Sequence, residues 1–252
     1  MAWQLKLRLL LSQAEFDWDI GGSPFFRRGP FHPIPERARQ HLPKFATQTK
    51  VRKNGKLTDV VSLCLLRAVS VRFKSLIERF QPGVHEFIPI ELRDHKGKPH
   101  DAEYYIFICH DLRDVVMPSR CLDRDWNVKE WPVFPHFESM RFGTSDQPIV
   151  ASAPALKGAS FFVQFLVREI GDHVCVSEAA YAALKTEKIT GFDMKEPWVA
   201  HWDEVDAPWD ADREAGPMIK VIEEHLESEV IQDLIAMNRP CVKRNKPHWL
   251  KT

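Results

Sequence analysis

Cys109, His110 and Asp111 are the residue types that a nucleophilic hydrolase needs: a thiol nucleophile, a general base and an orienting carboxylate. They stand at the end of the apolar run 103–109, which is predicted to be a strand. Because successive side chains of a strand point to opposite faces, the three residues cannot form a triad among themselves. We therefore favour a buried cysteine at a strand end, followed by a polar turn.

A metal site is conceivable in the polar segment 94–101, where Asp94, His95, His100 and Asp101 could supply oxygen and nitrogen ligands. Two lysines lie between the histidines and would repel a cation. We therefore interpret the segment as a solvated turn.

His225 and Glu229 lie four residues apart on a predicted helix, where such a pair first of all stabilises the helix. The sequence contains no GxxxxGK[ST], GxGxxG, HExxH or GxSxG motif. We accordingly assign no catalytic, cofactor-binding or metal-binding residue and expect a protein that is not an enzyme.

The segment 198–214 is rich in tryptophan and acidic residues. Tryptophan anchors beside carboxylates are typical of a surface that recognises a basic protein, because the rings bind and the charges steer. The alternative is a loop whose tryptophans are packed in the core while its acids are solvated. The residues predicted to contact a partner are Trp198, Trp202, Asp203, Glu204, Trp209 and Asp210.

The best-specified elements lie between residues 161 and 194. Residues 161–169 and 173–176 have strand composition and are separated by a Gly-Asp turn. Ser177 is positioned to cap a helix over about 177–187, and the apolar run from 189 should return to the sheet.

The other expected elements follow from periodicity and from glycine and proline positions. They are an edge or half-buried strand at 1–12, an irregular proline-rich segment at 17–45, a hairpin turn around Asn54-Gly55, a helix over about 69–80, a β-hairpin at 85–109 in which Pro89 marks an edge or bulge, loop-anchoring tryptophans at 126 and 131, a short strand at 136–142 and an amphipathic helix from about 218 to 237.

The chain has 252 residues, of which 44% are hydrophobic, with 35 basic and 35 acidic side chains. This composition is typical of an ordered globular protein. The absence of a basic excess argues against general nucleic-acid binding, and we expect no membrane-spanning helix. The five cysteines show no CxxC pair, which favours reduced thiols in a cytoplasmic protein. Cys64, Cys109 and Cys175 lie in apolar runs and are predicted to be buried.

Several blocks carry a family resemblance: a helix ending in Pro-Gly, a strand with an embedded proline, a Tyr-Tyr strand, a D-x-x-D turn, and a helix running into a Thr-Gly-Phe strand. They lie at 73–83, 86–92, 104–109, 111–114, 176–184 and 190–192. Over about residues 69–194 the chain resembles a bacterial immunity-protein family of polymorphic toxin systems, the Myxococcus-type immunity domain known as immunity family eleven. The segments before 50 and after 195 lie outside this resemblance.

The predicted fold is α+β, with a mixed, largely antiparallel sheet, a few packing helices and a C-terminal amphipathic helix. We expect one compact unit with three regions: an N-terminal strand and proline-rich extension (1–50), an immunity-like core (51–195), and an acidic tryptophan-rich loop, helix and basic tail (196–252).

The resemblance implies an immunity protein that binds and neutralises a cognate toxin by occlusion in the cytoplasm, without cofactor or turnover. Its partner would be the toxin rather than a nucleic acid or a membrane. The rival hypothesis is an unrecognised cytosolic, hydrolase-like enzyme. It predicts a deep pocket in which Cys109, His110 or His201 meets carboxylates. A housekeeping adaptor is a third possibility.

Overall fold

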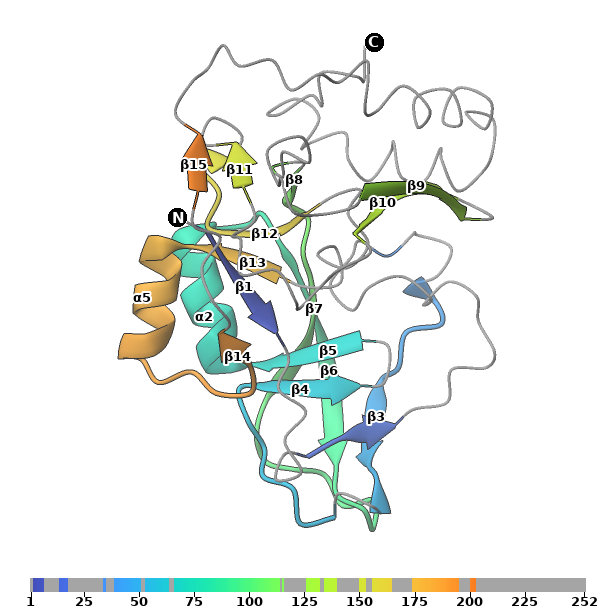
Figure 1. The fold of residues 1–252 in the computed structure, drawn as a ribbon. Helices are drawn as coiled ribbons and strands as arrows, with labels where there is room; N and C mark the ends of the chain where they lie inside the picture. Colours follow the sequence, from blue (N-terminus) through green and yellow to red (C-terminus); the bar gives the residue numbers. More distant parts are fainter. Residues whose placement is uncertain are drawn as a thin grey trace.

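The computed structural model describes a subset of the chain. The described residues are 2–6, 14–17, 34, 39–50, 53–63, 66–113, 115, 126–131, 134–139, 150–152, 156–164, 174–194 and 200–202. Among these residues, a six-stranded sheet, a five-stranded sheet and a pair of helices enclose the core, which confirms the predicted α+β class (Figure 1).

The larger sheet has six strands in the order β2-β3-β6-β7-β5-β4. Its pairings are antiparallel except for that between β3 and β6, which is parallel. The strands are β2 (Phe16–Asp17), β3 (Phe45–Gln48), β4 (Val60–Leu63), β5 (Leu66–Ser70), β6 (Glu86–Arg93) and β7 (Tyr104–Ile108).

The predicted hairpin at 85–109 is confirmed, because β6 and β7 pair antiparallel with Phe87 opposite Phe107. Pro89 lies opposite Tyr105, and β3 pairs only with residues 91–93 of β6. Pro89 therefore stands beyond the β3 pairing, where its missing N–H breaks no described ladder bond.

The turn around Asn54-Gly55 does not form the expected hairpin. The strands on either side of it, β3 and β4, pair with other strands, and β3 lies between β2 and β6. The turn is held instead by side-chain and backbone contacts: Gln48 Nε2 donates to Gly55 O at 3.3 Å and Ala14 N–H donates to Lys56 O at 3.0 Å.

The second sheet has five strands in the order β14-β1-β13-β12-β8. The strand β1 pairs with β13 on one side and β14 on the other, so of the predicted alternatives, an edge strand or a half-buried strand, the edge strand is wrong. Only β12 and β8 are parallel. The strands are β1 (Ala2–Lys6), β8 (Leu112–Arg113), β12 (Phe161–Gln164), β13 (Val174–Ser177) and β14 (Asp193–Met194).

The remaining described strands form two separate pairs. The strands β9 (Trp126–Trp131) and β10 (Phe134–Ser139) are antiparallel, and β11 (Val150–Ser152) and β15 (Ala200–Trp202) are parallel. A strand was expected near β10. The prediction that Trp126 and Trp131 anchor a loop is wrong, because both belong to β9.

Both internal helices begin where a serine can cap them. Helix α2 (Val71–Phe80) has Ser70 as its N-cap, and helix α5 (Glu178–Thr186) has Ser177, whose hydroxyl accepts the N–H of Ala180 at 3.3 Å. Val69, expected in the first helix, instead lies in β5. The expected helix at 218–237 lies outside the described residues.

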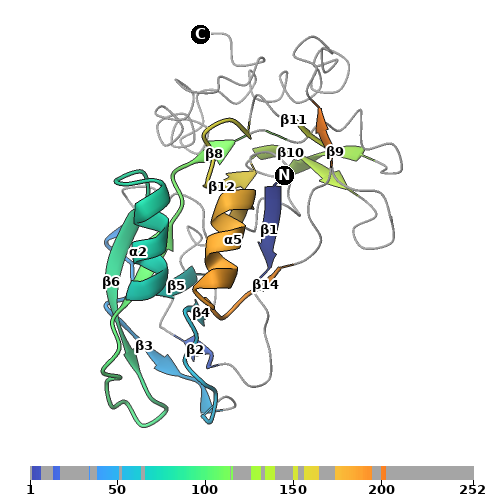
Figure 2. The ribbon, with the colours of Figure 1, turned by 90° about the vertical axis from the view of Figure 1, so that its left-hand side faces the viewer.

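The core consists of two clusters on opposite faces of the six-stranded sheet, as strand alternation requires. The face toward α2 and α5 also packs against residues of β12 and β13. The two helices lie side by side in both views (Figures 1 and 2). This arrangement joins the two sheets through one shared apolar layer.

Candidate functional site

Cys109, His110 and Asp111 contact different partners. Cys109 is a buried cysteine whose Sγ lies 3.7 Å from the carbonyl oxygen of Asp111. His110 Nε2 lies 3.2 Å from a carboxylate oxygen of Glu86, while the Asp111 carboxylate binds Arg113. The three side chains thus have different partners, and Cys109 and Cys175 are both buried as predicted. Cys64 lies outside the described residues.

Asp111 belongs to a buried polar cluster that we call the Gln81 junction, formed by Gln81, His85, Asp111 and Arg113. The Gln81 amide nitrogen donates to Asp111 Oδ2 at 2.8 Å, and its Oε1 accepts the backbone N–H of Phe161 at 2.6 Å. One side chain thereby connects the end of α2 with the start of β8 and with β12. Because a buried amide is costly when unpaired, these contacts fix how the two sheets meet.

Arg113 completes the junction with a bidentate ion pair. Its Nε and Nη2 donate to the two oxygens of Asp111 at 2.7 and 3.0 Å, and its Nη1 donates to the carbonyl of Lys157 at 2.9 Å. Both partners are almost fully buried. The sequence suggested only a polar turn here. The available signal was the i, i+2 spacing of opposite charges, which places both side chains on one side of a strand.

His85 is held as the neutral imidazole with its proton on Nε2. Its Nδ1 accepts the backbone N–H of His110 at 3.3 Å, so Nε2 must donate to Gln81 Oε1, which lies 3.1 Å away. A second proton on Nδ1 would face the N–H of His110. Burial, aided by the charge of nearby His110, lowers the pKa of His85 from 6.5 to about 3.

Acid should therefore destabilise the protein through His85. The unfolded chain takes up a proton near pH 6.5 whereas the folded chain does not until about pH 3, so stability falls as the pH drops through this window. Between pH 7 and pH 5 we expect a loss of about 2 kcal/mol from this one residue. Urea unfolding at the two pH values should show a smaller loss in His85→Asn. The control His41→Asn, at an exposed histidine, should keep the wild-type loss. Equal losses in all three proteins would contradict the assignment.

Glu86 is the described carboxylate that most resembles a component of an acid–base site. It lies between His110 and Arg39, whose Nη2 donates to Glu86 Oε2 at 2.7 Å, and all three side chains are about 30% exposed or less. The hydrogen bond from His110, together with that from Arg39, lowers the pKa of Glu86 to about 2. A carboxylate of such low basicity is a poor general base near neutral pH.

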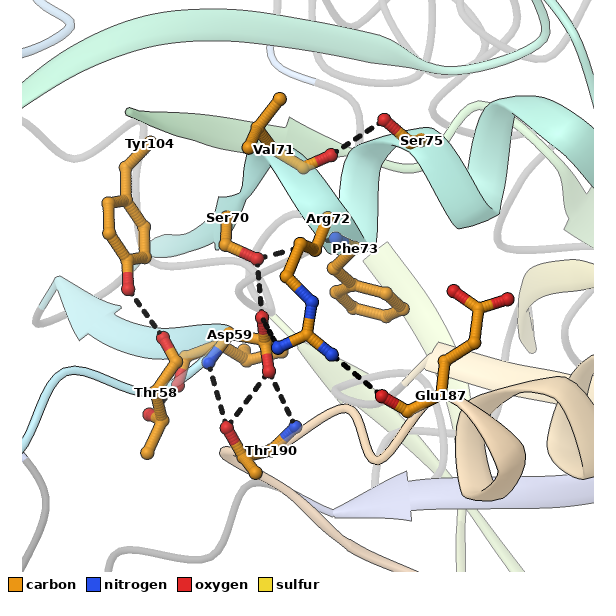
Figure 3. Close-up of polar contacts among 11 residues, drawn as sticks. Thr58, Asp59, Ser70, Val71, Arg72, Phe73, Ser75, Tyr104, Glu187 and Thr190 are labelled. Carbon is orange, nitrogen blue, oxygen red and sulfur yellow. Dashed lines mark hydrogen bonds and ion pairs between the residues drawn. The ribbon is translucent and has the colours of Figure 1, made fainter. Parts of the chain in front are cut away.

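A second polar cluster, formed by Asp59, Ser70 and Thr190, connects the loop before β4 to the segment after α5 (Figure 3). We call it the Asp59 junction. Asp59 Oδ2 accepts both the backbone N–H and the hydroxyl of Thr190, at 2.9 and 3.0 Å, although the two residues are 131 positions apart. Asp59 Oδ1 accepts the hydroxyl of Ser70 at 2.7 Å. The same serine caps α2 by accepting the N–H of Phe73 at 3.3 Å, so one carboxylate orients the helix cap and docks the distant segment.

Arg72 strengthens this junction from the solvent side. Its Nη2 donates to the carbonyl of Glu187 at 2.7 Å, and its Nη1 lies 3.7 Å from Asp59 (Figure 3). Arg79, on the same helix, forms an ion pair with the Glu187 side chain. The end of α5 is therefore attached to α2 by two arginines.

The polar turn at 94–101 is held by hydrogen bonds from its own backbone to the Asp94 side chain. Asp94 Oδ1 accepts the N–H groups of Lys96 and Lys98 at 2.8 and 2.9 Å, and these bonds lower the pKa of Asp94. Among the described residues no group of three His, Cys, Asp or Glu side chains is placed to hold a metal ion. Asp94, His95, His100 and Asp101 thus occupy a hydrogen-bonded turn.

Most of the predicted partner-binding residues lie outside the described region of the chain. The backbone of Trp202 is described, as the last residue of β15, and the other five residues fall in segments for which no structure is given. Their role remains a prediction. His225 and Glu229 also lie outside the described residues. Among the residues that the structure describes, no helix has both the length and the hydropathy to span a membrane.

The polar side chains of the two junctions form hydrogen bonds and ion pairs within the protein, and these contacts hold the two sheets in place. They offer structural hydrogen bonds and ion pairs, and their geometry does not bring a nucleophile and its base together. The partly exposed His110–Glu86–Arg39 group is the nearest approach to such a site.

Comparison with known proteins gives a match to a protein family. No curated protein matches the chain significantly. The family match begins at residue 8, whereas the resemblance described from the sequence begins at about residue 69. The proline-rich segment therefore lies inside the family match rather than outside it. The helix and strand blocks at 176–192 lie beyond its end. Residues 8–125 match the model of the immunity protein family (Imm11), which confirms the resemblance found in the sequence and indicates an immunity function.

Proposed function

We propose that this protein neutralises a cognate bacterial toxin by binding and occluding it, without turnover of its own. The observation that carries the proposal is the match of residues 8–125 to the immunity protein family. The described polar clusters support it, because their groups are engaged in holding the fold. A tight protein complex requires complementary surface and a few anchor residues rather than a catalytic motif.

We further propose that the tryptophan-rich acidic segment contacts the toxin through Trp198, Trp202, Asp203, Glu204, Trp209 and Asp210. This contact is proposed from composition alone, since tryptophan anchors and flanking carboxylates suit a basic partner surface. We propose that the protein acts in a reducing cytoplasm, either of the producing cell or of a sister cell, because its five cysteines show no CxxC pair.

The test is to co-express the protein with the product of its neighbouring gene, the expected toxin, in a sensitive host. We expect rescue of growth and co-purification of a stable complex. Toxicity that persists, with no co-purifying partner, would reject the proposal.

Titration of the purified toxin separates occlusion from catalysis. An occluding protein should abolish toxin activity only near equimolar amounts, whereas an enzyme would do so far below them. His110→Gln, which changes the nearest approach to an acid–base group, should protect as well as the wild type if its unfolding midpoint is unchanged. Protection at substoichiometric amounts, lost in His110→Gln, would favour the enzyme hypothesis instead.

A further inference from the structure

The turn at 53–56 carries an asparagine followed directly by a glycine, a pair for which the proposed function has no use. Asn54 and Gly55 lie between β3 and β4, and the Asn54 side chain is exposed. Within the part of the chain that the structure describes, no hydrogen bond or ion pair engages the Asn54 carboxamide. No described contact therefore prevents this side chain from rotating toward the backbone of the residue that follows it.

An asparagine in such a place is chemically labile, because it reacts with its own backbone. The amide nitrogen of the next residue attacks the asparagine Cγ, so that a bond from this nitrogen to Cγ forms and the Cγ–Nδ2 bond breaks. Ammonia leaves with the proton of the attacking nitrogen, and a cyclic succinimide remains. Water then opens the ring at either carbonyl carbon. The product is an aspartate or an isoaspartate, whose backbone runs through Cγ, and no oxidant or reductant is required.

Gly55 favours this reaction at Asn54. A glycine has no side chain to hinder the approach of its own nitrogen, and its backbone adopts the conformations that ring closure requires. The other asparagines of the chain precede larger residues; they are Asn127, Asn238 and Asn245. Asn127 also lies within β9, where pairing with β10 fixes the backbone. The sequence thus contains a single asparagine with a glycine after it, and the fold exposes that asparagine in a turn.

The same turn is attached to the rest of the fold by two contacts. Gln48, the buried last residue of β3, donates from Nε2 to Gly55 O, and Ala14 N–H donates to Lys56 O. An isoaspartate at position 54 inserts a further backbone carbon directly before Gly55, so Gly55 O moves relative to Gln48. An ordinary aspartate leaves the path of the backbone unchanged. Because a buried amide that loses an acceptor destabilises the fold, the isoaspartate is the more damaging product.

We propose that Asn54 is a site of spontaneous modification, at which the folded protein loses ammonia to give aspartate and isoaspartate, and that the isoaspartate weakens the attachment of the turn to β3. The modified turn carries an additional negative charge close in sequence to the exposed residues Lys53 and Lys56. The free α-carboxylate of the isoaspartate is the group on which an isoaspartyl O-methyltransferase acts. The proposal is independent of the proposed function.

The test is to incubate the purified full chain at neutral pH and physiological temperature and to follow its peptides over time by mass spectrometry. We expect the peptide that contains Asn54 to be replaced progressively by aspartyl and isoaspartyl forms, while the Asn127 peptide stays unchanged. Two variants should suppress the conversion: Asn54→Gln, which keeps an amide but must close a larger ring, and Gly55→Ala, which keeps the asparagine. An isoaspartyl O-methyltransferase with labelled S-adenosylmethionine should label the aged wild type strongly and both variants weakly.

Reaction in the folded state is the decisive point. If Asn54 stays intact in the native protein and deamidates only after unfolding in urea, the turn protects it and the proposal is wrong. Equal conversion at Asn127 would also overturn the proposal, because the reaction would then not depend on Gly55. The deamidated fraction, isolated by anion exchange, should unfold at a lower urea concentration than Asn54→Asp, which has the same charge on a normal backbone. Equal unfolding midpoints would overturn the weakened attachment to Gln48.

Discussion

A chain ended at residue 125, where the family match stops, should fail to fold. The described residues of that fragment include the whole six-stranded sheet, α2 and every member of the core cluster around Phe16 and Ile106. The opposite face of the same sheet, however, is covered by residues that the fragment lacks. They are Phe161, Val163, Val174, Val176, Ala180, Leu184 and Ile189.

The size of this loss decides the outcome. Burying one large apolar side chain stabilises the fold by roughly 1.5–3 kcal/mol. The six large side chains of this set, all except Ala180, therefore contribute on the order of 10 kcal/mol. That equals the whole stability of an ordinary domain. The fragment would also leave Phe73 and Phe107 exposed and would lose the partners of Asp59 and Gln81 beyond residue 125.

Near-UV circular dichroism and dye binding provide the measurement. We expect fragment 1–125 to show no near-UV signal and to bind the hydrophobic dye ANS, as a collapsed chain without fixed packing does. The full chain is the control and should show a cooperative unfolding transition. A cooperative transition in the fragment would contradict the prediction and would mark residues 8–125 as an autonomous unit.

Replacement of Gly191 by alanine should be among the most damaging single substitutions in the described region. Gly191 has φ +102° and follows Thr190, the residue that docks on Asp59. A Cβ at this position would lie 2.2 Å from the carbonyl oxygen of Val60 and 2.8 Å from both Val60 N and Thr58 Oγ1. Two of these three atoms are backbone, which cannot rotate away.

We expect Gly191→Ala to lower the free energy of unfolding by about 4 kcal/mol, combining forced displacement of β4 with the strain of a positive φ. Gly158→Ala is the matched control, because Gly158 has φ +74° but nothing within 4 Å of its added Cβ. It should show the conformational strain alone, about 1–2 kcal/mol. Chemical denaturation of both variants measures the difference, and equal losses would show that close packing at Gly191 is unimportant.

Local elements followed from the sequence because their causes are local. Ser177 and the alanine-rich run after it determine where α5 begins, whatever packs against the helix. The hairpin of β6 and β7 follows from two apolar runs joined by a short polar turn. Local signals also explain the error at residue 69, which was predicted to be helical but lies in β5. A β-branched residue at a strand–helix junction is compatible with both elements, so its type does not decide where the helix begins.

The candidate site was only partly predictable. Nothing in the sequence around Glu86 indicated that Arg39 and His110 contact it, because these contacts join segments 47 and 24 positions apart. The acidic tryptophan-rich segment is proposed as a contact surface from its composition, which suggests a basic partner but says nothing of the geometry of contact. The separate roles of Cys109, His110 and Asp111 were correctly anticipated from strand alternation.

The sequence by itself determined the secondary structure of the well-patterned segments, the α+β class and the family resemblance. The tertiary structure decided what joins them: β1 inserted between β13 and β14, the parallel pairings of β3 with β6 and of β12 with β8, and the Asp59–Thr190 contact across 131 positions. The physical reason is that helix caps and hairpins are fixed by neighbours along the chain. Long-range pairings depend instead on the burial of whole faces, and many distant residues satisfy that condition together.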